Sequence, residues 1–131
     1  MTYRWRVRQP EFLLLHRAAS GPDSEGEWAW TPPGGNREED ETIDRCATRE
    51  LREETGFDVT PWRAEGDSAE WFVYTVEVPP DQEPCLSDEH DRHVWLPYAE
   101  AAARVLPAIV RDQFVRAARV IEQRTEHGPR A

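Results

Sequence analysis

The chain has 131 residues, 38% of them hydrophobic and six of them tryptophan, which is enough for one domain with an apolar core and argues against disorder. Its formal net charge of −10 argues against a nucleic-acid polymer or an anionic membrane surface as partner, because both are bound through an excess of Lys and Arg. A small phosphorylated substrate is compatible with this charge, since a bound Mg²⁺ reverses the local sign.

The first third of the chain is predicted to consist of short strands separated by loops. Alternating aromatic or aliphatic residues and arginines near the N-terminus are typical of a strand with one wet face. A short apolar run and a pair of alternating tryptophans indicate two more strands, and clusters of Gly, Pro, Asp and Ser indicate the loops. Strands are predicted at residues 3–7, 12–15 and 28–30, and loops at residues 19–27 and 31–41.

A helix is predicted from Thr42 to Thr55, and its inward face begins apolar and ends in the carboxylates of Glu50 and Glu54. Neither glutamate is expected to have a basic partner within the helix, whereas Glu53 has Arg49 four residues earlier. Unpaired carboxylates on an inward face are costly, and the usual compensation is a divalent cation held by oxygen ligands. The pattern therefore favours a Mg²⁺ or Mn²⁺ site over a solvated acidic face.

The rest of the chain is predicted to add strands, an acidic loop and two helices. The predicted strands cover residues 57–62, 71–78 and 94–96, the polar loop covers residues 79–91, and the helices cover residues 97–105 and 107–124. The tail from Thr125 is expected to fray. Strands and helices are mixed without a regular βαβ alternation, which fits an α/β sandwich with a mixed sheet in a single domain, residues 1–131.

The compartment is predicted from cysteine usage and from the N-terminal residues. Cys46 and Cys85 are the only cysteines, and one lies inside the predicted helix, so a disulfide framework is not expected and a reducing compartment is favoured. Residues 1–10 lack the apolar stretch of a signal peptide, and no run of the chain reaches transmembrane length. We therefore expect a cytoplasmic protein.

The segment from Gly35 to Phe57 resembles the Nudix box, written Gly-x5-Glu-x7-Arg-Glu-U-x-Glu-Glu-x-Gly-U, where U is a bulky hydrophobe. Every fixed position is matched, by Gly35, Glu41, Arg49, Glu50, Leu51, Glu53, Glu54, Gly56 and Phe57. Phe57 is aromatic where an aliphatic residue is commoner, and Asp40 stands where many members have a second glycine. Upstream, residues 30–35 resemble the Trp-x-x-Pro-Gly-Gly approach that is common in the family, while the rest of the chain resembles it only loosely.

This resemblance implies a Nudix-type α/β/α sandwich with a mixed β-sheet and hydrolysis of a phosphoanhydride bond in a nucleoside diphosphate derivative, with Mg²⁺ or Mn²⁺ as cofactor. The favoured substrate is a dinucleoside polyphosphate, followed by a (deoxy)nucleoside triphosphate, and the sequence leaves a homodimer open. The alternative is a non-catalytic Nudix-fold module that senses a nucleotide or a metal, although such a module has no need for every carboxylate of the box. A simple divalent-cation buffer ranks last, because the chain lacks an EF-hand loop.

The resemblance also assigns roles within the box. The implied metal ligands are the backbone carbonyl near Gly35 and the side chains of Glu50, Glu53 and Glu54. Glu53 is the first candidate for the general base that activates water. Arg49 is expected to orient the glutamates, and Glu41 is expected to be a supporting acid or an ordinary first-turn acid.

Outside the box, Glu89 in the acidic loop is the second candidate for the general base, because several members of the family carry a further acid in the corresponding loop. An ordinary solvated loop acid is an equally good interpretation of Glu89. His90 and His93 are interpreted as surface histidines, since an all-oxygen Mg²⁺ site does not need imidazole.

Three residues are predicted to bind the substrate: Trp30, Tyr74 and Arg17. Stacking of a base on an aromatic ring contributes roughly 1–3 kcal/mol in nucleic-acid binders. Some dinucleoside polyphosphate hydrolases carry a tyrosine about as far after the box as Tyr74. An aromatic residue on a strand nevertheless belongs to the core more often than to a ligand platform, so both interpretations of Trp30 and Tyr74 stay open.

Overall fold

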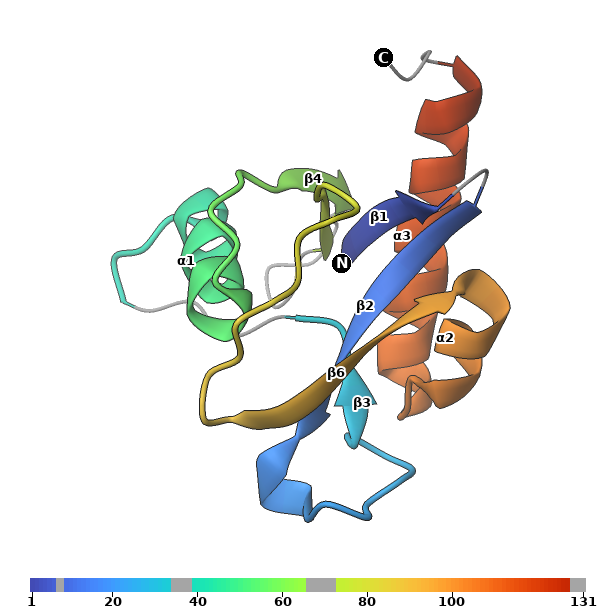
Figure 1. Ribbon diagram of the computed structural model, residues 1–131. Coiled ribbons are helices and arrows are strands. Elements are labelled where there is room, and N and C mark those ends of the chain that lie inside the picture. Colours follow the sequence, from blue (N-terminus) through green and yellow to red (C-terminus); the bar gives the residue numbers. More distant parts are fainter. Residues whose placement is uncertain (7–8, 34–38, 66–72, 128–131) are drawn as a thin grey trace.

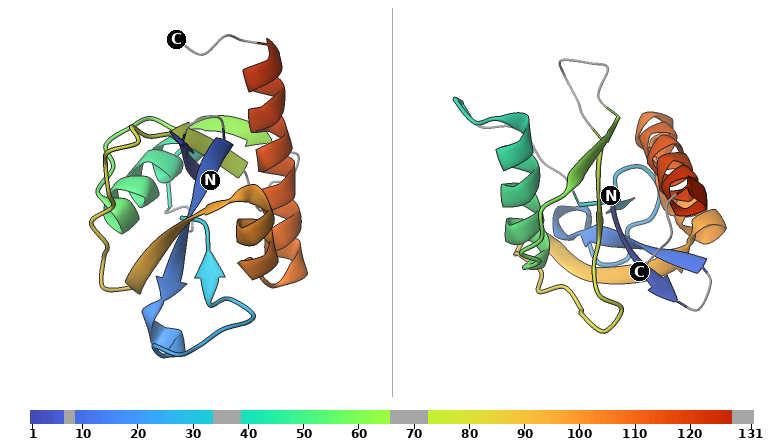
Figure 2. Two further views of the ribbon diagram at one scale, coloured as in Figure 1. Left: turned by 45° about the vertical axis from the view of Figure 1, so that its right-hand side comes forward. Right: turned by 90° about the horizontal axis from the view of Figure 1, so that it is seen from above.

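The computed structural model of the protein describes residues 1–6, 9–33, 39–65 and 73–127. Its strands are β1 (Thr2–Arg6), β2 (Gln9–Arg17), β3 (Trp30–Thr31), β4 (Trp62–Glu65), β5 (Val73–Glu77) and β6 (His90–Pro97). Its helices are α1 (Ile43–Thr55), α2 (Tyr98–Arg104) and α3 (Ala108–His127), with a short 3-10 helix, η1 (Ala18–Ser20), after β2. The sheet lies between α1 on one side and α2 and α3 on the other (Figures 1 and 2). The expected α/β sandwich is therefore confirmed.

Strand β2 is the centre of the sheet. It pairs antiparallel with β1 and β3 along one edge and with β6 along the other, where Glu11 to Arg17 face the residues of β6. Strand β1 also pairs in parallel with β5, and β5 pairs antiparallel with β4. The sheet is mixed, as the sequence pattern predicted.

Two apolar clusters form because successive side chains of β2 point to opposite faces of the sheet. Phe12 and Leu14 pack with residues of α2 and α3, whereas Leu13 and Leu15 pack with Leu51 of α1. All four β2 side chains are at most 1% exposed. A strand buried on both faces reads as a continuous apolar run rather than an alternating one, which is the pattern these residues show.

Both ends of α1 are set by residues close to it in sequence. Thr42 is the N-cap, and its Oγ1 accepts a hydrogen bond from the backbone N–H of Arg45 at 3.2 Å. Gly56 ends the helix in the left-handed conformation, at φ +76°, and its N–H bonds the carbonyl of Arg52 at 2.8 Å. A Cβ at this position would also come within 3.3 Å of Cys85 Cβ. Both the positive φ and this close contact therefore favour glycine here.

Several predicted elements differ from the structure. Strand β2 begins at Gln9 and not at residue 12, and β3 covers Trp30–Thr31 and not residues 28–30. Strand β6 begins at His90 instead of residue 94, because its pairing with β2 extends through the whole second half of that strand. Residues 57–61 do not form a strand, and β4 begins at Trp62, directly after a proline that has no N–H to donate. Helix α3 continues to His127, since no Gly or Pro interrupts it before residue 128. The predicted strand residues Val7, Trp71 and Phe72 lie outside the described residues, and so do residues 34–38 of the predicted loop at residues 31–41.

In the described part of the chain, no helix combines the length and the apolar character needed to cross a bilayer.

Candidate metal centre

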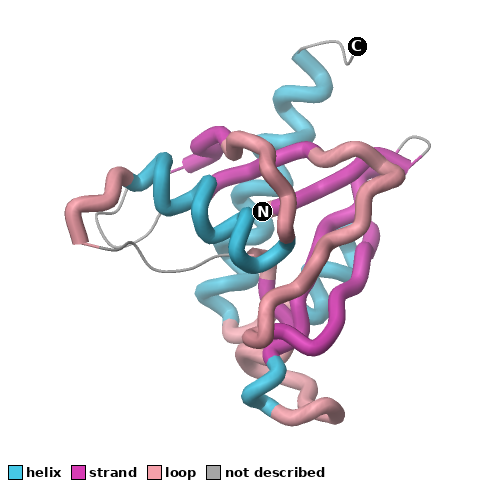
Figure 3. The backbone as a smooth tube through the Cα atoms, turned by 60° about the vertical axis from the view of Figure 1, so that its left-hand side comes forward, coloured by secondary structure: helices cyan, strands magenta, loops and turns pink. Residues whose placement is uncertain are grey.

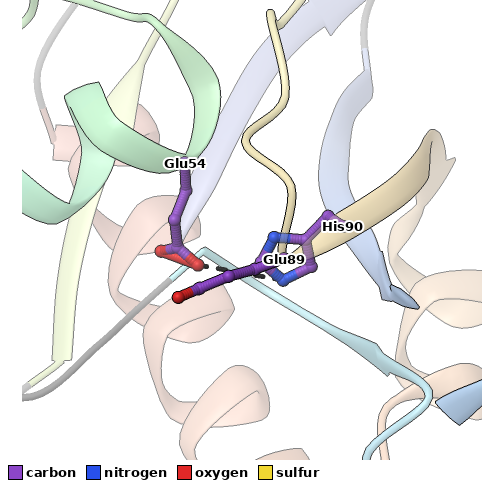
Figure 4. A group of neighbouring side chains, drawn as sticks. All are labelled: Glu54, Glu89 and His90. Atoms are coloured by element: carbon purple, nitrogen blue, oxygen red, sulfur yellow. Dashed lines mark ion pairs between the residues drawn. The ribbon is translucent and has the colours of Figure 1, made fainter. Parts of the chain in front are cut away.

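Three side chains from two separate parts of the chain meet beside the C-terminal end of α1. Glu54 comes from the last turn of α1, Glu89 from the turn before β6, and His90 is the first residue of β6. One potential ligand atom of each residue lies within 4.8 Å of those of the other two. Figure 4 shows the three side chains converging, with His90 Nε2 at 3.8 Å from Glu54 Oε1. We refer to Glu54, Glu89 and His90 as the metal group.

Backbone hydrogen bonds bring the second part of the metal group to the first. The loop between β5 and β6 runs past the end of α1 (Figure 3), where the N–H of Cys85 donates to the carbonyl of Thr55 at 2.7 Å. At the far end of the loop, the N–H of Ala18 donates to the carbonyl of Glu89 at 2.9 Å. The loop is therefore held to both α1 and η1, and this places Glu89 and His90 opposite Glu54.

The side chain of His90 is buried, although the sequence interpretation placed it on the surface. Only 8% of the side chain is exposed, and its Nδ1 has no hydrogen-bond partner among the described residues. Burial lowers the pKa of His90 below its usual range, while the neighbouring carboxylate of Glu89 opposes this effect. The lowered pKa favours the neutral imidazole, which is the form that binds metals. The interpretation of His90 as a surface histidine was therefore wrong. The only feature of the sequence that could have indicated its place in the site was its position next to Glu89.

The donor set of the metal group fits a divalent cation. The side chain of Glu54 is only 5% exposed, whereas Glu89 is exposed. The group therefore combines a buried carboxylate, an accessible carboxylate and the buried imidazole of His90. Carboxylate oxygens and imidazole nitrogens are ordinary ligands of divalent ions. His93 does not belong to this group, because its Nε2 lies 3.1 Å from Glu83 Oε1.

Arg49 binds three glutamates at once. Its Nε and Nη2 donate to the two carboxylate oxygens of Glu41 at 2.6 and 2.9 Å, and its Nη1 donates to Glu50 at 2.9 Å and to Glu53 at 3.1 Å. The expectation that Glu50 lacks a basic partner in the helix was therefore wrong. Adjacent residues do not face each other on a helix, but the long side chain of Arg49 spans the gap while its fork holds Glu41. These contacts suit a residue that orients the glutamates.

The charge of Glu89 in the metal group acts on Glu50. Burial raises the pKa of Glu50 above its usual range, the hydrogen bond and charge of Arg49 oppose the rise, and the carboxylates of Glu53 and Glu89 add to it. Glu53 itself is 57% exposed at its side chain. Neither Glu50 nor Glu53 belongs to the metal group, and Gly35, the predicted carbonyl ligand, lies outside the described residues.

Trp30 is placed in the core, which does not support its predicted role as a base platform. Its side chain is 3% exposed, and its Nε1 donates to Glu25 at 2.9 Å. The ring of His16 contacts it edge-on at 4.8 Å between centroids, and the guanidinium carbons of Arg92 and Arg104 lie 5.3 and 5.4 Å from its ring centroid. These neighbours leave no ring face of Trp30 open to a base.

Tyr74 and Arg17 lie at different distances from the metal group. The hydroxyl of partly buried Tyr74 donates to Asp44 in the first turn of α1. Asp44 precedes Glu54 by ten residues, or about 15 Å along the helix. Arg17 is exposed and is paired across the sheet with His90, and its guanidinium carbon lies 5.7 Å from the ring centroid of Trp28. Of the three predicted substrate residues, Arg17 is thus the one that strand pairing places next to a residue of the metal group.

Comparison with known proteins gives a consistent result. A model of the NUDIX domain matches residues 5–117. The structure is similar to that of an Ap4A hydrolase from C. elegans, with a TM-score of 0.70 and 22% sequence identity over 93% of each chain. It is also similar to the MutT protein of Methanosarcina mazei Go1, with a TM-score of 0.58 and 27% identity over 90% of this chain and 91% of that one. The dihydroneopterin triphosphate pyrophosphohydrolase of E. coli matches with a TM-score of 0.66 and 21% identity over 93% of each chain.

Proposed function

The chain belongs to the Nudix family, and we propose that it is a divalent-metal-dependent pyrophosphohydrolase that cleaves a phosphoanhydride bond of a nucleoside diphosphate derivative. The observation that carries the proposal is the meeting of Glu54, Glu89 and His90 beside the helix of the Nudix box. Carboxylates this close repel each other, and a divalent cation between them turns the repulsion into binding.

Residues of the chain around the metal group supply positioning. When bound, the cation neutralises charge on the phosphate oxygens and lowers the pKa of its bound water. Arg49 locks Glu50 and Glu53 into one arrangement through its bonds at 2.9 and 3.1 Å. Arg17, opposite His90 in the sheet, offers an exposed guanidinium that can donate to two oxygens of a substrate phosphate.

Two acids compete for the role of general base. Glu53 ranks first by resemblance, whereas position favours Glu89, because Glu89 is exposed and belongs to the metal group while Glu53 accepts a hydrogen bond from Arg49. At a metal concentration that saturates each variant, so that a lost ligand charge is compensated, we expect Glu89→Gln to lower kcat by about two orders of magnitude or more, as for loss of a base, and Glu53→Gln to lower it less. The reverse order in steady-state kinetics would assign the base to Glu53.

Among substrates, we place dinucleoside polyphosphates first and (deoxy)nucleoside triphosphates second. The support is the partly exposed tyrosine on β5, Tyr74, together with a fold shared with an Ap4A hydrolase and with a pyrophosphohydrolase of a pterin triphosphate. A non-catalytic module that senses a nucleotide is the alternative function.

The deciding experiment measures phosphate and pyrophosphate release from diadenosine polyphosphates, nucleoside triphosphates, nucleotide sugars and ADP-ribose, with Mg²⁺, with Mn²⁺ and with EDTA. At least one substrate should be hydrolysed with a metal and none with EDTA. Glu54→Gln should lower this rate by at least about a hundredfold, because it removes a ligand charge, whereas Glu100→Gln on the exposed surface of α2 should not change it. Nucleotide binding without release under any metal would favour the sensing module instead.

A further inference from the structure

We propose that His90 is itself a ligand of the bound cation, and that its nitrogen makes this centre prefer first-row transition-metal dications such as Mn²⁺ and Co²⁺ over Mg²⁺. The inference rests on the proposed function and deepens it by naming the class of cation. A metal group made only of carboxylates would not carry this preference.

The position of His90 is the first argument. Its ring is 92% buried, since 8% of the side chain is exposed, yet Nδ1 has no hydrogen-bond partner among the described residues. Nε2 points toward Glu54 Oε1 at 3.8 Å, which is beyond hydrogen-bond range. Buried polar atoms are almost always satisfied, yet Nε2, the nitrogen that faces Glu54, has this carboxylate only at 3.8 Å. A cation bound by Nε2 and by the two carboxylates would give all three residues a close contact.

The other histidines with described side chains provide the comparison. His16 is fully buried, and both of its ring nitrogens are bonded, Nδ1 to Asp91 Oδ1 at 2.7 Å and Nε2 to the carbonyl of Ser24 at 2.8 Å. His93 is partly exposed and bonds Glu83 at 3.1 Å. The hydrogen bonds of His16 and His93 thus give both residues a structural role. Among the histidines whose side chains the structure describes, His90 is the buried one with a ring nitrogen that has no hydrogen-bond partner.

The chemistry of the donor set supplies the selectivity. Mg²⁺ is a hard ion that demands oxygen ligands in near-ideal octahedral geometry and gives up its water reluctantly. Imidazole nitrogen binds the divalent ions of the first transition row better than it binds Mg²⁺. One nitrogen and two carboxylates therefore favour the transition-metal ions, even though both classes of ion can bind the carboxylates.

The test measures metal binding in the absence of substrate. Isothermal titration of the metal-free full-length chain with Mn²⁺ and, separately, with Mg²⁺ gives both Kd values for the wild type, for His90→Asn and for the control His93→Asn. His90→Asn should weaken Mn²⁺ binding by at least about tenfold, the lower end of what outer-shell changes cost in metal affinity, and should weaken Mg²⁺ binding much less. His93→Asn should leave the ratio of the two Kd values unchanged. An unchanged ratio in His90→Asn would overturn the proposal.

A second variant and a second measurement keep the proposal testable if His90→Asn does not fold. His90→Asp replaces the nitrogen with oxygen, so it should retain Mg²⁺ binding and lose the preference for Mn²⁺. In the wild type, Mn²⁺ should broaden the NMR signals of the His90 ring before those of His93, and equal broadening would refute direct ligation. These binding measurements do not depend on hydrolysis, so the two proposals can fail separately. A protein that binds Mn²⁺ through His90 but hydrolyses no substrate would refute only the proposed function. A protein that hydrolyses a substrate but binds Mn²⁺ independently of His90 would refute only this inference.

Discussion

The network around Arg49 allows a quantitative prediction about stability. Replacing Arg49 with Ala removes its hydrogen bonds to three glutamates, two to Glu41 and one each to Glu50 and Glu53, and its contact with Cys46 Sγ at 4.0 Å. It also leaves the carboxylates of the three glutamates near one another without the positively charged guanidinium that bridges them. We therefore expect the variant to be less stable than the wild type in metal-free buffer.

The magnitude follows from the exposure of each pair. The bidentate pair with Glu41 is mostly buried, since the side chains are 22% and 12% exposed, and hydrogen bonds to charged groups of this kind are worth about 1.5–3 kcal/mol. The pair with Glu53 is more exposed, at 57% for the glutamate, and contributes only about 0.3–0.5 kcal/mol as an i,i+4 pair. These two pairs together give a loss of about 2–3.5 kcal/mol in the free energy of unfolding, to which loss of the pair with Glu50 adds.

The assay is urea unfolding in EDTA, followed by tryptophan fluorescence and analysed by linear extrapolation. Arg52→Ala is the matched control, because Arg52 lies on the same helix and its pair with Asp58 is 61% and 78% exposed. That variant should lose at most about 0.5–1 kcal/mol. If Arg49→Ala were no less stable than Arg52→Ala, the Arg49 network would not support the helix as we argue.

Burial raises the pKa of Glu50, so the folded state loses stability as pH rises above 4.5, the usual pKa, and Glu50 ionises. In EDTA, the stability of Glu50→Gln should therefore increase relative to the wild type as pH rises above 4.5, and a constant difference in urea unfolding would contradict this. If a base stacks on Tyr74, Tyr74→Ala should raise KM for a dinucleoside polyphosphate by roughly 5- to 150-fold, while Tyr74→Phe, which keeps the ring, should leave KM unchanged. A lowered melting temperature of Tyr74→Ala with an unchanged KM would show that Tyr74 is a core residue. Mn²⁺ at about 100 times its Kd should stabilise the chain by roughly 2.7 kcal/mol in calorimetry, and no shift would argue against a bound cation.

Local sequence determined the helix that carries the box. Thr42 caps it, Gly56 ends it, and the apolar spacing through Leu51 turns Glu50 and Glu54 inward. Each of these features acts within one or two turns, so the sequence alone was sufficient to predict them. The continuous apolar run at residues 12–15 likewise predicted a strand, and the structure buries it on both faces, where no position is left for a polar side chain.

Contacts between distant segments decided the rest. His90 and Glu54 are 36 residues apart, and they are brought together by the bonds that hold the β5–β6 loop to α1 and η1 and by the pairing of His90 with Arg17 in the sheet. Trp30 has the same alternating pattern whether its ring is stacked on a substrate or buried, and the strands and helices packed around it decided for the core. Sequence patterns report which face of an element a residue occupies. What that face meets depends on tertiary packing, and this is why the glutamates of the helix were predictable while the histidine opposite them was not.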